Sequence, residues 1–323
     1  MRAGHRSTIA MAMAIPMLAP VWGGCAFDRN AESGVDAAGA LDTMNPTDPT
    51  RPTSDSDACD ARAAWHADRL ENLGTSDGWL TLVGLDFLDA GTFAAGRDEK
   101  ATLSYGGCAA DRIGRFEVEG EVVRFVPEAG ASVSIEGGVA GEPLIADDAG
   151  PPSVVRSGTV SFTLVRRNDR LALRVRDSAS PTLSGFEGLG LFPFDPGMVV
   201  EATVRPAAAE ARMPIVNVTG HTDMQPLAAT IAFELDGVRH EFQAMPAGDD
   251  ALFVVFADGT NGRETYGGGR FLLVPKSRDG RVTLDFNRAY FPPCAFTAFA
   301  TCPMPPASNR LARRLEAGER WPE

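Results

Sequence analysis

The feature that most constrains the fold of this chain is a series of short β-type segments separated by glycine and proline turns. The 323 residues include 34 glycines and 23 prolines, a composition that favours turns over long helices. The segments are regularly spaced, without a fixed-period repeat. The pattern predicts a mainly β fold, an antiparallel sheet sandwich or barrel-like sheet, with a short N-terminal helix and a short C-terminal helix.

The N-terminal helix is expected at Asp57–Leu73. Asp57 is suited to cap its first turn, Trp65 and the nearby alanines supply an apolar stripe, and Gly74 is a typical stop. The β region is expected to begin shortly afterwards, at Gly78.

The dipeptide Asp236-Gly237 predicts a β-hairpin. Asp-Gly suits a type I′ turn, in which both central residues need a positive φ. Ile231–Leu235 then pairs with Val238–Phe242, and Leu235 faces Val238, Phe233 faces His240 and Ile231 faces Phe242. His240 shares the apolar face and is expected to be buried, either as a hydrogen-bonded core residue or as a general base. His66 and His221 have no predicted neighbours.

The dipeptide Asp279-Gly280 predicts a second hairpin that carries the candidate ligand site. The same register pairs Val274 with Asp285, Leu272 with Asn287 and Arg270 with Ala289, so that three polar side chains share one part-apolar face. Three consecutive glycines directly precede this hairpin, and they would let backbone amides approach a ligand closely. The candidate ligand-binding residues are Tyr266, Gly267, Gly268, Gly269, Arg270, Asp285, Asn287 and Arg288.

The same residues also fit a structural interpretation. The glycines could form a tight strand entry, while the nearby carboxylates cap turns and pair with Arg270. If the chain is instead an enzyme, Asp258, Glu264 and Asp285 are the candidate catalytic acids or bases, which requires two carboxylates to converge on one cleft.

The sequence resembles a bacterial family, domain of unknown function 1684. The resemblance spans about residues 61–323, and this chain departs from the family at Phe291, where a polar residue is expected. The family implies a domain but no activity. The C-terminal matches are Tyr266–Leu272, Leu284–Tyr290, Pro292–Phe296, Ala300–Pro303 and Asn309–Leu311, and the N-terminal ones are Gly78–Leu80, Gly84–Leu85, Phe186–Leu189 and Phe192–Pro193.

Residues 1–25 have the layout of a secretion signal. Arg2 and Arg6 give a basic start, and an apolar stretch follows that is shorter than the roughly 20 residues needed to span a bilayer. It ends in Trp22-Gly23-Gly24-Cys25, which resembles a bacterial lipobox. Cys25 is therefore the expected lipid attachment site, and ordinary cleavage with a free or paired Cys25 is the alternative.

Residues 26–60 are rich in Asp, Ser, Thr, Pro, Gly and Ala, and they are expected to form a disordered acidic linker. Residues 61–323 would then be a single β-rich domain held at a bacterial membrane, facing the periplasm or the cell surface. The net charge of −13, with only two lysines, excludes the basic surface of a nucleic-acid binder.

Four cysteines remain after Cys25, and in an oxidising compartment an even number suggests two disulfides. The favoured pairs are Cys59–Cys108 and Cys294–Cys302. A zinc-thiolate site is the alternative, but the four histidines are scattered and no His-Glu-x-x-His occurs, so no metal or other cofactor is expected.

No nucleophile elbow, phosphate-binding loop, dinucleotide fingerprint or EF-hand loop occurs in the sequence. We therefore expect a tethered module that binds a small polar ligand, a sugar or a carboxylate. The alternatives are a hydrolase-like enzyme that uses a carboxylate in the same cleft, and an envelope scaffold whose polar cluster is structural.

Overall fold

The computed structural model describes residues 55–276 and 279–322. The expected signal segment, Cys25 and residues 26–54 of the expected linker lie outside these described residues. Within the described residues no helix is long and apolar enough to cross a membrane.

Helix α1 (Asp55–Leu73) begins two residues before the expected cap and ends where predicted. Its start lies inside the expected linker, so the folded part begins before residue 61. Trp65, Arg69 and Leu73 are buried on one face of the helix.

The second α-helix, α2 (Pro181–Ser184), lies in mid-chain. Near the C-terminus the chain forms a 3-10 turn at Ala307–Asn309 instead of an α-helix. After this turn the backbone bonds to Ala257, whose N–H donates to the Asn309 carbonyl and whose carbonyl accepts from the Leu311 N–H. These extended-chain hydrogen bonds replace those of a helix.

Residues 82–177 form two sheets that enclose one core. The rings of Phe116, Phe125 and Phe162 pack at its centre, 4.8 and 5.6 Å apart between neighbouring centroids. One sheet has the order β1-β9-β8-β7-β6, namely Leu82–Phe87, Arg170–Asp177, Val160–Arg167, Val154–Ser157 and Ser134–Glu136. The other has the order β3-β2-β4-β5, namely Leu103–Ser104, Gly91–Gly96, Gly114–Glu119 and Val122–Pro127.

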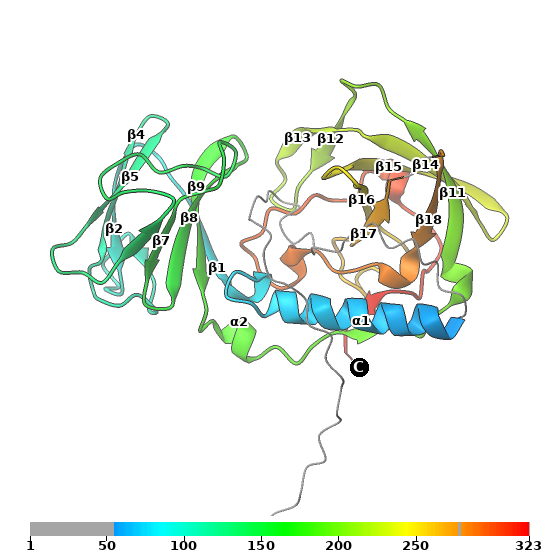
Figure 1. Ribbon diagram of the computed structural model, residues 1–323, viewed down its shortest axis with the longest axis horizontal. Coiled ribbons are helices and arrows are strands. Elements are labelled where there is room, and N and C mark those ends of the chain that lie inside the picture. The colour runs from blue at the N-terminus through cyan, green and yellow to red at the C-terminus, as the bar shows by residue number, and fades with distance from the viewer. Residues whose placement is uncertain (1–54, 277–278, 323) are drawn as a thin grey trace, which may run out of the picture. The chain divides into compact units, whose positions relative to one another are not determined.

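The C-terminal part is built on a six-stranded antiparallel sheet that nearly closes into a barrel (Figure 1). Four phenylalanine rings pack inside it. An isolated bridge between Phe271 and Tyr290 ties the β17 edge to the segment that follows β18. The order is β17-β16-β15-β14-β11-β18, namely Arg270–Pro275, Ala251–Phe256, Val238–Ala247, Ala229–Leu235, Val199–Pro206 and Arg281–Asp285, around Phe233, Phe242, Phe256 and Phe286.

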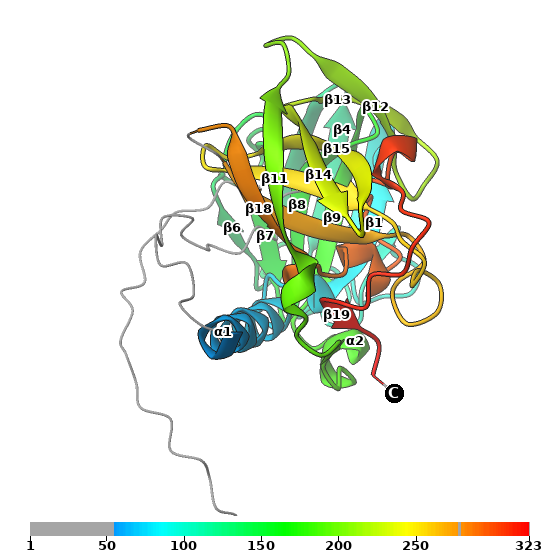
Figure 2. The same cartoon turned by 90° about the vertical axis from the view of Figure 1, so that its right-hand side faces the viewer.

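Helix α1 lies across one end of this barrel-like sheet, as Figures 1 and 2 both show. Trp65 meets the ring of Tyr290 edge-on at 6.5 Å between centroids. Two short pairs of strands complete the fold: β12 (Arg212–Val216) with β13 (Thr222–Pro226), and β10 (Gly190–Leu191) with β19 (Glu319–Arg320).

The hairpin predicted at Asp236-Gly237 is confirmed residue by residue. Strands β14 and β15 pair Leu235 with Val238, Phe233 with His240 and Ile231 with Phe242. His240 is only partly buried, against the ring of Phe233 at 5.4 Å. The expectation of a buried His240 was wrong because this end of the hairpin projects into solvent, where Val238 is 55% exposed.

The register predicted across Asp279-Gly280 is wrong. Strand β17 pairs with β16, and β18 pairs with β11, so the two segments lie at opposite edges of the sheet order. A turn signal specifies that the chain reverses, but long-range pairing decides which edge each segment joins. Strand β18 also ends at Asp285, and Phe286–Arg288 forms a 3-10 turn that cannot continue the predicted ladder.

Candidate functional site

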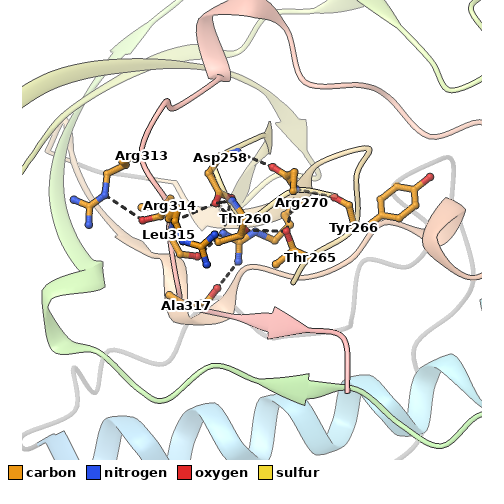
Figure 3. Close-up of polar contacts among 10 residues, drawn as sticks. Asp258, Thr260, Thr265, Tyr266, Arg270, Arg313, Arg314, Leu315 and Ala317 are labelled. Atoms are coloured by element: carbon orange, nitrogen blue, oxygen red, sulfur yellow. Dashed lines mark hydrogen bonds and ion pairs between the residues drawn. The ribbon is translucent and has the colours of Figure 1, made fainter. Parts of the chain in front are cut away.

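The centre of the predicted site is a buried ion pair between Arg270 and Asp258 (Figure 3). Arg270 Nη2 lies 2.7 Å from Asp258 Oδ2, and both side chains are 0% exposed. The same guanidinium also donates to the carbonyls of Leu315 and Ala317. The partner of Arg270 is thus Asp258, which lies before the glycine run, and not the predicted Asp285.

The second oxygen of Asp258 is also fully used. Asp258 Oδ1 accepts hydrogen bonds from the backbone N–H of Thr260 at 2.8 Å, the Thr260 hydroxyl at 2.7 Å and the N–H of Leu315 at 3.1 Å. Burial lowers the pKa of the Arg270 guanidinium, and the Asp258 charge opposes that shift. A pair without exposed surface and with these bonds cannot meet a ligand from solvent, so the geometry agrees with the structural interpretation.

A separate local turn contains Asp285, Asn287 and Arg288, which bond to one another. Asp285 Oδ1 accepts from the backbone N–H and from the side-chain amide of Asn287, both at 3.0 Å, and Arg288 Nε lies 3.5 Å from Asp285 Oδ2. Asn287 Nδ2 also donates to the Asp195 carbonyl at 3.0 Å. None of these hydrogen bonds involves Arg270, so the structure does not bring the predicted trio together.

Glu264 forms a third separate pair. Its Oε1 lies 2.8 Å from Arg314 Nη2, and this hydrogen bond lowers the pKa of Glu264. Asp258, Glu264 and Asp285 are therefore each held by a different arginine. Among the described residues these three candidates form no pair of carboxylates that face each other, as an acid/base mechanism in one cleft would need.

The glycine run serves close packing at two of its three positions. Gly269 has a φ of +102°, and a Cβ there would lie 2.5 Å from Pro305 Cγ and 2.7 Å from the Phe256 carbonyl oxygen. At Gly268 a Cβ would lie 2.4 Å from the Tyr266 ring. Gly267 is exposed, and its nearest neighbouring atom would be 3.7 Å away.

Tyr266 belongs to a different cluster. Its ring points away from the Arg270–Asp258 pair in Figure 3, and its hydroxyl hydrogen-bonds with the side chain of Cys294. Cys294 in turn contacts Cys302, whose sulfur accepts a hydrogen bond from the Cys294 N–H at 3.2 Å.

Neither expected disulfide is present, because the four described cysteines are free thiols. Cys294 and Cys302 are nevertheless side by side, as their predicted pairing requires. Cys59 is exposed on α1, whereas Cys108 is buried in the core between the two N-terminal sheets.

Sequence reasoning missed a cluster of arginines on strand β9. The guanidinium carbons of Arg174 and Arg176 lie 5.3 and 5.9 Å from the ring centre of Trp79. Because Arg174 and Arg176 are two residues apart on a strand, their side chains lie on the same face, opposite the core residues of β9. This Arg-x-Arg spacing, between apolar neighbours, was the signal that could have revealed them.

Arg176 is the unusual member of this cluster. Within residues 55–276 and 279–322 it has no hydrogen bond and no carboxylate within ion-pair distance, although its Nε is buried. Burial is the main cause that lowers the pKa of Arg176, and the nearby charges of Arg156 and Arg167 add to it, while Asp77 opposes it. Arg156 and Arg167, in contrast, have their own carboxylate partners, Glu136 and Asp147.

Two hydroxyl side chains lie beside these arginines. Ser161 is opposite Arg176 and Thr163 is opposite Arg174 in the pairing of β8 with β9. Both Ser161 and Thr163 are buried. Trp79, Arg174, Arg176, Ser161 and Thr163 are called the arginine cluster below.

His66 and His221, for which the sequence predicts no neighbours, each lie near a carboxylate. His66 Nε2 lies 4.0 Å from Oε1 of Glu319, which forms a buried ion pair with Arg69. Burial is the main cause that lowers the pKa of His66. His221 Nε2 lies 2.9 Å from Asp223 Oδ1 and 3.7 Å from Oδ2 of the exposed Asp169.

Phe291, where the family leads us to expect a polar residue, is fully buried and packs on the ring of Trp321 at 4.6 Å. Its backbone N–H donates to Glu319 Oε2 at 2.6 Å. The side chain thus supplies packing, and the polar contact comes from the backbone.

The comparisons with known proteins give a family but no activity. The model of a protein family of unknown function, DUF1684, matches residues 184–320. An uncharacterized protein of Haloarcula marismortui, with a solution NMR structure, is 38% identical over 44% of this chain and 80% of its own, with a TM-score of 0.37. No curated protein matches the chain significantly.

Replacing Arg270 with alanine is expected to lower the free energy of unfolding by about 3–5 kcal/mol, because it leaves the buried Asp258 carboxylate without its counter-charge. Chemical denaturation measures the loss. Arg288→Ala is the matched control, since its ion pair with Asp285 is partly exposed, and it should cost at most about 1 kcal/mol. Equal small losses in both variants would contradict a structural role for Arg270.

The glycine run can be tested by two alanine substitutions. Gly269→Ala is expected to be strongly destabilising, by more than about 1 kcal/mol, because its φ is positive and its Cβ would meet proline and backbone. Gly267→Ala, two residues away, should change the stability by less than about 0.5 kcal/mol. If Gly269→Ala were as stable as wild type, the packing account of this glycine would be wrong.

Proposed function

Through residues 184–320 the chain belongs to the DUF1684 family of unknown function, and from this premise we propose that it is a membrane-tethered module that binds a small carboxylate. The arginine cluster is the proposed binding site. The observation that carries the proposal is Arg176, a partly buried guanidinium without a counter-ion among the described residues.

An unpaired charge in a partly buried position is costly, and proteins rarely keep one without use. A carboxylate fits here because it would accept two parallel hydrogen bonds from a guanidinium. At a separation of about 4 Å and an effective dielectric constant of about 20, the attraction between two such charges is about 4 kcal/mol before desolvation is subtracted. A neutral sugar would leave the charge of Arg176 uncompensated, so a carboxylate is favoured over a sugar.

The surrounding residues favour a small ligand over a polymer. Arg174 adds a second positive charge, and both guanidinium groups lie over the ring of Trp79. Ser161 and Thr163 are at the neighbouring positions of the paired strand. The whole chain carries a net charge of −13, which repels polyanions. A compact basic cluster on an otherwise acidic protein therefore favours a small anion over a polyanion.

The location of the protein is part of the same proposal. A basic start, a short apolar stretch and a lipobox-like end at Cys25 support export and lipid attachment at a bacterial membrane. A tethered binding module would meet its ligand outside the cytoplasm.

The site can be tested by replacing Arg176 with methionine. The ligand-free variant is expected to be more stable than wild type by about 1 kcal/mol, because a desolvated charge surrounded by other arginines is removed. In the same variant the rise in melting temperature caused by carboxylates should disappear. The measurement is thermal unfolding of the full chain against a panel of mono- and dicarboxylates, with neutral sugars as the second arm.

Arg170→Met is the matched control, because Arg170 lies on the same strand but is exposed and paired with Asp89. It should leave both the stability and the ligand response unchanged. At about 100 times its Kd a carboxylate would stabilise the wild-type protein by about 2.7 kcal/mol. A less stable Arg176→Met variant, together with no response of the wild type to any carboxylate, would refute the binding site.

The anchor can be tested independently with Cys25→Ser. This variant is expected to move from the membrane fraction to the soluble fraction of the producing bacterium, because a stable anchor needs the acyl chains that Cys25 would carry. Its unfolding transition should be unchanged. Retention of the variant in the membrane fraction would contradict lipid attachment at Cys25.

A further inference from the structure

The proposed carboxylate site does not use the thiols of Cys294 and Cys302. Cys294 lies in the 3-10 turn Pro293–Ala295, and Cys302 follows after a short aromatic loop. The Cys294 N–H donates to Cys302 Sγ at 3.2 Å, and the two side chains hydrogen-bond with each other. The hydroxyl of Tyr266 hydrogen-bonds with Cys294 as well.

The two thiols are unequal in exposure. Cys294 is partly exposed, whereas Cys302 is buried. They are also unequal as acids. The hydrogen bond from Cys302 lowers the pKa of Cys294, burial opposes this shift, and the hydrogen bond from Tyr266 again lowers the pKa. The hydrogen bond to Cys294 and then burial raise the pKa of Cys302.

We propose that Cys294 and Cys302 form a reversible thiol–disulfide couple, in which Cys294 is the attacking thiolate and Cys302 the resolving thiol. The geometry supports these roles because the attacking sulfur must be reachable from solvent and the resolving sulfur must lie next to it. Tyr266 is a positioning residue, since its hydroxyl acts on the sulfur of Cys294. This inference does not depend on the carboxylate site.

The co-reactant is a disulfide, either a small one or that of an oxidising protein. The Cys294 thiolate attacks one sulfur of this disulfide, so that a mixed disulfide forms and one thiolate leaves and takes up a proton. Cys302 then loses its proton to solvent and attacks the Cys294 sulfur, which releases the second thiolate. Overall the two cysteines lose two electrons and two protons, and the co-reactant gains them as two thiols.

Two features agree with a reversible couple. Both cysteines are free thiols in the described structure, which therefore represents the reduced member of the couple. The positive charge of Arg174 also acts on Cys302, where it partly offsets the rise in pKa that the hydrogen bond to Cys294 and burial cause. Cys108, in contrast, is a buried thiol whose pKa is raised to about 11, chiefly by burial.

The first experiment is alkylation of the reduced full chain with iodoacetamide over a pH series, with each cysteine followed by peptide mass spectrometry. The midpoint for Cys294 is expected below the ordinary thiol value of about 8.5. Tyr266→Phe should raise this midpoint, because it removes one hydrogen-bond donor. Tyr105→Phe, which removes a tyrosine hydroxyl bonded to Asp86 instead, is the matched control and should leave it unchanged.

The second experiment uses oxidised glutathione. The wild-type chain should form the Cys294–Cys302 disulfide, with a loss of two hydrogens, and dithiothreitol should reverse it in the folded protein. Cys302→Ser should stop at the mixed disulfide on Cys294, and Cys294→Ser should leave Cys302 unmodified.

Three results would overturn the couple. The first is a Cys294 midpoint at or above about 8.5, and the second is a Cys302→Ser variant that takes up no glutathione. The third is a disulfide that dithiothreitol reduces only after unfolding, which would make the bond a permanent structural one.

Discussion

The ion pair between Arg270 and Asp258 is the interaction on which the C-terminal part of the structure depends. A charge with no exposed surface is tolerated only when its hydrogen bonds are met inside the protein. Arg270, at the start of β17, pairs its two terminal nitrogens with Asp258 and with the carbonyls of Leu315 and Ala317, while its buried Nε has no partner among the described residues. One side chain therefore fixes three segments: the strand, the loop that begins at Asp258 and the C-terminal stretch.

A second buried pair extends this arrangement to α1. Arg69 on the helix pairs with Glu319 on β19, and it also donates to the Phe291 carbonyl at 2.8 Å. The charge of Glu319 acts on Arg270 as well, so the two pairs are neighbours of alternating sign. The helix, the barrel-like sheet and the C-terminal segment are thus joined by buried pairs of opposite charge.

Arg176 shows the opposite arrangement with the same chemical group. It is partly buried, with its guanidinium carbon 5.9 Å from the ring centre of Trp79, yet it has no carboxylate partner among the described residues. The guanidinium of Arg270, which is paired with a carboxylate, holds the fold, and that of Arg176, which has no carboxylate partner among the described residues, is where a ligand would contribute most. A binding site in this protein is therefore better sought among charged groups that lack a counter-charge than among those that the fold already pairs.

The sequence by itself determined the local features: the mainly β class, the helix that ends at Leu73, and the hairpin at Asp236-Gly237 with its exact register. Each depends on contacts between residues close in the chain, where periodicity and turn chemistry decide the outcome. Only the tertiary structure decided that β17 and β18 lie at opposite edges of the sheet order, that Asp258 is the partner of Arg270, and that Arg176 has no carboxylate partner among the described residues. These outcomes depend on contacts between segments that are far apart in the sequence. Which partner a buried charge reaches is decided by how the surrounding segments pack.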